Sequence, residues 1–178
     1  VNISRLHLYQ KGFVERYLGL IRRWHVPPGL VELELTESAY TDNPRQIIEI
    51  TKKLQAMGFV ILMDDFGSGY SSLNMLKDVP VDILKIDLKF LDSNDTSGRG
   101  GNILNSVVRM AKWLRIPVIA EGVETRQQAE FLRTIGCNRV QGYYYSRPVP
   151  VTEYEAMLSK ECAAYSLPAS KPAPQQLD

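Results

Sequence analysis

The sequence predicts an α/β fold, and three observations lead to this prediction. Short apolar segments with strand character alternate with segments of helical period along most of the chain. Some strand-like segments, such as 60–63 (VILM), are apolar at every position, which is typical of parallel strands covered on both faces. Polar residues gather at the carboxyl ends of these segments. Because strands that alternate with helices pair in parallel through right-handed crossovers, these ends should share one edge of a sheet or barrel.

Strands and helices can be assigned along the chain from these patterns. A helix is predicted over 44–57, because Asp42 or Asn43 can cap its start and Gly58 stands just past its end. A second helix is predicted over 102–114. Six strands are predicted, over residues 1–4, 31–37, 59–66, 83–87, 117–124 and 139–143.

Two polar stretches are expected to lie outside the packed fold. The stretch 92–101 (DSNDTSGRGG) is typical of a mobile surface loop. Residues 163–178 combine prolines with small and polar residues, so we expect one domain over 1–162 followed by a disordered tail or linker. Trp24 and Trp113 occur within helical patterns, and we expect both to anchor the core.

The composition is that of a soluble globular domain with a reduced, cytoplasmic location. The 178 residues are 44% hydrophobic and carry a net charge of +1, so no charge excess indicates a nucleic-acid polymer or an anionic membrane as partner. The sequence has no apolar run long enough to span a bilayer and no signal peptide, which predicts no membrane contact by this segment. Cys137 and Cys162 do not have the spacing of a metal finger.

Polar side chains recur where the predicted strands end, and this edge binds ligands in barrels and open α/β sheets. Each residue alone has a simpler explanation, such as turn formation for Asp64 and Asp65 or a helix start for Glu34 and Glu37. Their recurrence at one edge favours a site instead. The residues are Asn2, Glu34, Glu37, Asp64, Asp65, Lys85, Asp87, Glu121, Glu124 and Gln141.

Several carboxylates at one edge repel one another unless cations neutralise them. The set therefore predicts hard divalent ions with oxygen ligands, Mg²⁺ or Mn²⁺. Asp64 and Asp65 can reach the same ions only if the strand ends there, and Phe66-Gly67 supplies that break. The adjacent pair is suited to a site that binds two ions.

Two other motifs resemble parts of the glycine-containing loop. Asp65-Phe66-Gly67 matches the metal-binding tripeptide of protein kinases, but the sequence has no HRD-type loop. The stretch 67–72 (GSGYSS) is not a Walker loop, because no GK[ST] follows it, and an ordinary turn remains the alternative.

Taken together, these motifs resemble the EAL domain family over roughly residues 1–158, in the order of the family. The matching phrases are VNIS (1–4), LELTES (33–38), DDFGSGYSSL (64–73), LKID (84–87), IAEGVET (119–125) and QGY (141–143). The resemblance implies a TIM-like β/α barrel that hydrolyses cyclic di-GMP to linear pGpG. It also implies a homodimer, and a longer parent protein with an upstream GGDEF or sensory domain and a membrane anchor in some cases.

The resemblance also implies roles for individual residues. Asn2, Glu34 and Asp64 would hold one Mg²⁺ or Mn²⁺ ion, and Asp64 would bridge to a second ion held by Asp65 and Glu121.

Other residues would act on water, substrate and loop. Lys85, Glu121 and Gln141 would be catalytic, with Lys85 orienting the attacking water and Gln141 supporting the water network. Asp87 and Gln141 would lie beside the substrate. Replacing Lys85 is expected to lower turnover while leaving metal binding and folding largely intact. The regulatory loop, which would couple the site to dimerisation, comprises Glu37, Phe66, Gly67, Ser68 and Gly69.

One departure from the family concerns the start of the chain. The family has an N-terminal stretch with two further strands and the glutamate after which it is named, and six strands do not close an eight-stranded barrel. We therefore expect an incomplete barrel that is poorly active alone. Three functions stay open: an active phosphodiesterase, a catalytically inactive cyclic di-GMP binding or regulatory module, and an unrelated metal-dependent barrel enzyme.

Overall fold

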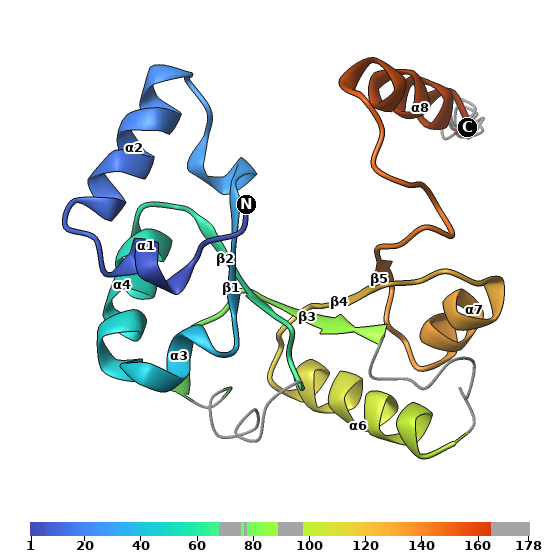
Figure 1. Ribbon diagram of the computed structural model, residues 1–178. Helices are drawn as coiled ribbons and strands as arrows, with labels where there is room; N and C mark the ends of the chain where they lie inside the picture. The colour runs from blue at the N-terminus through green and yellow to red at the C-terminus, as the bar shows by residue number, and fades with distance from the viewer. Residues whose placement is uncertain (68–75, 77, 89–97, 165–178) are drawn as a thin grey trace, which may run out of the picture. The chain divides into compact units, whose positions relative to one another are not determined.

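The computed structural model describes residues 1–67, 76, 78–88 and 98–164, apart from the side chains at 41–42 and 160–164 (Figure 1). The chain forms two compact units, Val1–Tyr145 and Ser146–Asp178. The first unit contains the sheet and every described candidate site residue. The second contains the helix α8 (Val151–Ala164).

A parallel sheet organises the first unit, with its strands hydrogen-bonded in the order β1-β2-β3-β4-β5. The strands are β1 (Glu32–Thr36), β2 (Val60–Asp64), β3 (Ile83–Asp87), β4 (Val118–Glu121) and β5 (Arg139–Val140). The helical elements of this unit are α1 (Arg5–Leu8), α2 (Phe13–Arg23), η1 (Pro28–Leu30), α3 (Ala39–Asp42), α4 (Pro44–Ala56), α6 (Arg99–Trp113) and α7 (Arg126–Thr134). The alternation of strands and helices confirms the predicted α/β class.

The two faces of the sheet differ in chemistry. Side chains alternate along a strand and parallel partners point the same way, so the strand registers assign each residue to a face. One face is apolar and belongs to the main core, with Leu33, Leu35, Ile61, Met63, Leu84, Ile86 and Ala120 buried. The other face carries the polar residues Glu34, Asp64, Lys85, Asp87 and Glu121.

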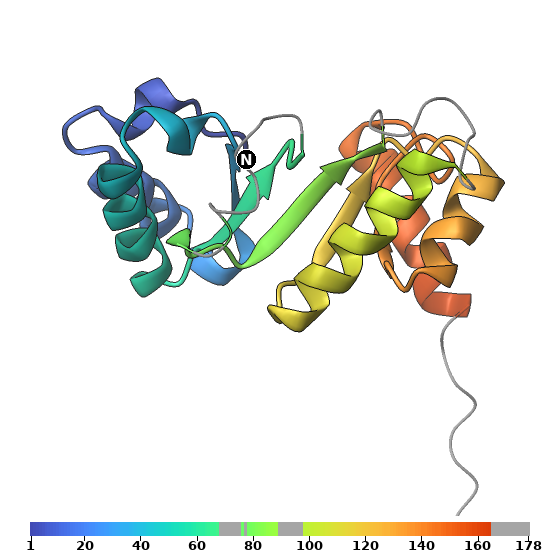
Figure 2. The same cartoon turned by 90° about the horizontal axis from the view of Figure 1, so that it is seen from below.

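Helices cover the apolar face. In α6, Leu104, Val108 and Ala111 are buried at helical spacing, and Figure 2 shows this helix running beside β3 and β4. Helix α4 begins at Pro44 after the Asn43 cap, and Gly58, with a φ of 92°, lies just past its end. These caps confirm the predicted helix to within one residue.

Several sequence predictions need correction. The predicted strand 1–4 contributes a single bridge, between Asn2 and Glu34, because the chain turns into α1 after Ser4, whose side chain accepts a hydrogen bond from the Leu6 backbone N–H. In the predicted loop 92–101, residues 98–101 are described, and Arg99–Gly101 form the first turn of α6. Residues 163–164 belong to α8, and the division at residue 162 remains a prediction.

The prediction that both tryptophans anchor the core is wrong. Trp24 is 71% exposed and Trp113 is 78% exposed. Each stands at the carboxyl end of its helix, Trp24 at the cap of α2 and Trp113 as the last residue of α6. An arginine lies over each ring, Arg23 over Trp24 and Arg109 over Trp113, both at 5.8 Å from the ring centroid.

None of the helices in the described ranges is both long and apolar enough to cross a membrane. His7 and His25 are exposed.

Candidate functional site

The ammonium group of Lys85 is the centre of the candidate site. Its side chain is 5% exposed, and its Nζ lies 2.9 Å from Glu34 Oε1 and 3.6 Å from Asp64 Oδ1. Glu121 Oε1 is in direct contact with the same nitrogen. The three carboxylates come from β1, β2 and β4, so three separate strands meet at one buried cation.

Strand register explains why these side chains meet. Thr36 pairs with Asp64, Lys85 with Ile119 and Asp87 with Glu121, so the polar residues stand at the carboxyl ends of neighbouring strands. They also share the face that the helices leave uncovered. The sequence pattern predicted this edge. Of the five residues predicted to converge on metal ions there, Glu34, Asp64 and Glu121 meet at the Lys85 ammonium.

Burial and charge shift the pKa values of Lys85 and Glu121. Desolvation alone would lower the pKa of Lys85, but its interactions with Glu121 and Glu34 and the nearby charge of Asp64 outweigh this and raise it. Burial raises the pKa of the Glu121 carboxyl; Lys85 opposes that rise, while the charges of Asp64 and Glu34 add to it. Lys85 is therefore held as a cation, while Glu121 takes up a proton more readily than a solvent-exposed glutamate.

A second buried carboxylate, Glu37, fixes the segment that follows β2. Glu37 is 3% exposed, and its Oε2 accepts a hydrogen bond from the Gly67 backbone N–H at 3.2 Å. Its own backbone N–H donates to the carbonyl of Asp64 at 3.1 Å, and Phe66 donates to the carbonyl of Lys85 at 3.2 Å. Glu37 thus anchors the start of the predicted regulatory loop; Ser68 and Gly69 of that loop lie outside the described residues.

The remaining predicted residues surround the cluster. Asn2 is exposed and bridges to Glu34 through the backbone. Asp65 is exposed, and its φ of 56° lies in a region that few residues other than glycine adopt, so the strand ends at Asp64, before the predicted break at Phe66-Gly67. Asp87 stands opposite Glu121 in β3. Gln141 is exposed just after β5, and its backbone N–H donates to the Ala120 carbonyl at 2.8 Å.

Glu34, Asp64 and Glu121 are three of the residues predicted to hold metal ions. Within the part of the chain that the structure describes, no group of three or more His, Cys, Asp or Glu side chains is arranged to hold a metal ion. Glu34, Asp64 and Glu121 face the Lys85 ammonium instead, because it neutralises part of their charge. The donor chemistry nonetheless fits a hard divalent cation, because the three carboxylates exceed the one ammonium in charge and offer oxygen ligands.

Sequence reasoning missed three residues beside the site. Gln128 caps α7 and accepts hydrogen bonds from the backbone N–H groups of Glu124 and Thr125 at 2.8 and 3.0 Å. The spacing Thr125-x-x-Gln128 is a capping box and could have been recognised. Gly142 lies at a close backbone approach and Gly122 has a φ of 74°, and the sequence alone does not reveal either.

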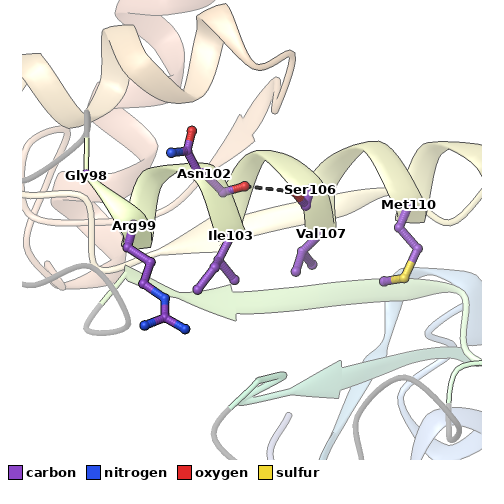
Figure 3. A pocket seen from close by; sticks show the side chains of 7 residues that line it. All are labelled: Gly98, Arg99, Asn102, Ile103, Ser106, Val107 and Met110. Carbon is purple, nitrogen blue, oxygen red and sulfur yellow. Dashed lines mark hydrogen bonds between the residues drawn. The ribbon is translucent and has the colours of Figure 1, made fainter.

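A separate hollow of about 710 Å³ lies along α6 (Figure 3). Figure 3 shows Arg99, Ile103, Val107 and Met110 projecting from the same side of the helix. Val107 also lines a small cavity with Phe66 and Gly67, so the hollow borders the segment that Glu37 anchors.

Comparison with known proteins assigns the family. The sequence model of the EAL domain matches residues 1–148. The chain belongs to the EAL domain family. Its fold is accordingly the TIM-like β/α barrel of that family, of which the described residues form a five-stranded parallel part.

A curated relative and two solved structures illustrate the similarity. The cyclic di-GMP phosphodiesterase NbdA of Pseudomonas aeruginosa is 37% identical over 172 residues, which are 97% of this chain and 22% of NbdA. The structure of the PaMucR phosphodiesterase in complex with cyclic di-GMP is 37% identical with a TM-score of 0.80, covering 86% of this chain and 62% of that one. The manganese and cyclic di-GMP complex of Klebsiella pneumoniae BlrP1 is 31% identical with a TM-score of 0.77, covering 83% of this chain and 38% of that one. The chain spans about a fifth of the length of the curated relatives it matches first.

The ion pairs of Lys85 alter the expectation that its replacement leaves folding and metal binding intact. In the variant Lys85→Met, three clustered carboxylates lose their shared counter-charge, so the EDTA-treated protein should lose about 3 kcal/mol of unfolding free energy. Millimolar MnCl₂ should restore part of this loss, because the added cation then has no ammonium to compete with. Urea unfolding followed by circular dichroism, with and without MnCl₂, measures both effects.

Lys52→Met is the matched control, because Lys52 is exposed on α4. It should unfold like the original protein under both conditions. Equal unfolding free energies of Lys85→Met and the original protein in EDTA would show that the ion pairs do not stabilise the protein.

Proposed function

We propose that this chain is a phosphodiesterase domain that hydrolyses one phosphodiester bond of cyclic di-GMP, giving linear pGpG. The observation that carries the proposal is the meeting of Glu34, Asp64 and Glu121 at the buried Lys85 ammonium, at the carboxyl edge of an EAL barrel. The relative NbdA is named a cyclic di-GMP phosphodiesterase, and PaMucR was solved with cyclic di-GMP, which supports this substrate.

The predicted ligand set suits two divalent ions, Mg²⁺ or Mn²⁺. Held by Asn2, Glu34, Asp64, Asp65 and Glu121, they would supply Lewis acidity towards the phosphodiester and an acidified water. Manganese in the BlrP1 complex supports the choice of a divalent ion.

The chain's own residues act on substrate and water. The Lys85 ammonium, whose raised pKa keeps it charged, donates hydrogen bonds to the attacking water or to a phosphate oxygen and stabilises negative charge that develops there. Gln141 supports the water through its side-chain amide. Asp87, beside Glu121 in the register, lies next to the substrate.

Glu121→Gln tests the enzymatic role of the cluster. The amide keeps the shape of the side chain but loses its charge, so hydrolysis of cyclic di-GMP with MgCl₂ or MnCl₂ should fall by about 10²-fold or more. Glu49→Gln, on the exposed side of α4, is the matched control and should retain full activity.

Chromatographic quantification of pGpG and isothermal titration with cyclic di-GMP together separate the outcomes. Binding without turnover by the original chain would favour the alternative of an inactive binding or regulatory module. Absence of both binding and turnover would contradict the proposed substrate.

We also propose that the chain forms a homodimer through the hollow along α6. The resemblance implies that the loop beginning at Phe66 couples the site to dimerisation. The position of the hollow supports this, because Val107 lines both the hollow and the cavity that contains Phe66 and Gly67.

Ile103→Asp tests the dimer surface. Ile103 is 38% exposed in the hollow, and a charge there should weaken self-association by about tenfold or more in sedimentation equilibrium. Leu20→Asp, on α2 and 48% exposed, is the control and should associate like the original chain. A dimer that tolerates Ile103→Asp, or a chain that remains monomeric at all concentrations, would contradict this surface.

A further inference from the structure

The turn that follows β4 is held by the chain that follows β5. The Val123 backbone N–H donates to the carbonyl of Gln141 at 3.1 Å, and the Tyr144 backbone N–H donates to the carbonyl of Val123 at 3.0 Å. The Gln141 N–H donates to the Ala120 carbonyl at 2.8 Å. These bonds extend the pairing of β4 and β5 beyond both strand ends, and they fix Gln141 beside the residue that follows Ala120, which is Glu121.

A close backbone approach makes this pairing depend on Gly142. A Cβ added at Gly142 would lie 2.1 Å from the Val123 carbonyl oxygen and 2.4 Å from the Val123 nitrogen. Both contacts are with backbone, so no rotation of a side chain could relieve them. Any larger residue at this position must therefore push the two segments apart.

The other end of the turn is held by α7. Gln128 Oε1 accepts hydrogen bonds from the N–H groups of Glu124 and Thr125, and Thr125 Oγ1 accepts one from the Gln128 N–H at 3.2 Å. The turn after Glu121 thus has one fixed end at Gln141–Tyr144 and another at the start of α7.

Glu121 and Gln141, the two predicted functional residues of this region, both adjoin this turn. Glu121 contacts the Lys85 ammonium, and Gln141 supplies two of the backbone hydrogen bonds. Gln141 is exposed, so its two backbone hydrogen bonds, rather than burial, fix its position. Its backbone position depends on the close approach of Gly142 to Val123.

We propose that Gly142 and Gln128 are positioning residues of the candidate site, which clamp the turn 122–125 and so hold Glu121 and Gln141 in a fixed relation. The inference rests on the proposed function, since it assigns a purpose to the alignment of those two side chains. Displacement of an aligned group by about 1 Å costs about 10²-fold in rate. The clamp acts through Glu121 and Gln141 rather than on the substrate.

Gly142→Ala tests the clamp, with Gly19→Ala as the matched control. An alanine Cβ at Gly19 has no other atom within 4 Å. Gly142→Ala should lower kcat for cyclic di-GMP by about tenfold or more, with KM changed by less than about threefold, and should weaken Mn²⁺ binding in isothermal titration. Amide exchange should rise at Val123 and Tyr144 while the amides of β1 and β2 stay protected. Gly19→Ala should match the original chain in every readout.

Gln128 provides a second, milder test that does not depend on tolerance of a steric clash. Gln128→Ala removes the acceptor and should lower kcat several-fold, whereas Gln128→Glu keeps a capping oxygen and should restore it. If Gly142→Ala does not fold, this pair decides the question. Unchanged kcat and Mn²⁺ affinity in Gln128→Ala, or in a folded Gly142→Ala, would overturn the proposed clamp.

The proposed function and the clamp fail in different ways. An original chain that does not hydrolyse cyclic di-GMP contradicts the function. The clamp is then judged by Mn²⁺ affinity and amide exchange, which need no turnover.

Discussion

Burial of the Lys85 ammonium among three carboxylates is the interaction on which the site depends. Taking a charge out of water costs several kcal/mol, and partners must compensate for it. Glu34, Asp64 and Glu121 do so from three different strands, and their own repulsion is reduced in return. The strand register and the site are therefore not independent, since a slip of one residue would turn Lys85 into the apolar core.

The two faces of the sheet have different roles: one stabilises the fold and the other carries the candidate site. The helix-covered face is apolar along β1 to β4, so its packing supports the fold without polar groups. The opposite face carries charge at the carboxyl ends of the strands. The segments that follow these strand ends are held by local contacts. These are the Glu37 hydrogen bond after β1, the positive φ of Asp65 after β2, and the backbone hydrogen bonds of the turn after β4.

Much of this arrangement could be predicted from sequence, because it follows from short periodic patterns. Continuous apolar runs gave the parallel strands, and polar residues at their ends gave the common edge. Helix α4 was bounded by recognisable caps at Asn43 and Gly58. The family motifs then supplied roles for residues such as Lys85.

Other features depend on tertiary contacts that no local pattern reveals. Trp24 and Trp113 have helical spacing, but they stand at the carboxyl ends of their helices and are exposed. The sequence also did not show that Lys85 would contact the carboxylates directly, because its position relative to Glu34 and Glu121 depends on pairing across strands. The need for glycine at 142 arises from the backbone of Val123, in the turn after β4, which is distant in sequence.

The central claim is that Glu34, Asp64 and Glu121 form one cation-binding cluster around Lys85. Anomalous diffraction from crystals of the chain grown with MnCl₂ tests it most directly. We expect manganese density bounded by the carboxylates of Glu34, Asp64 and Glu121, with the Lys85 ammonium displaced from its present contacts. Manganese found only at other surfaces, with Lys85 still contacting all three carboxylates, would contradict it.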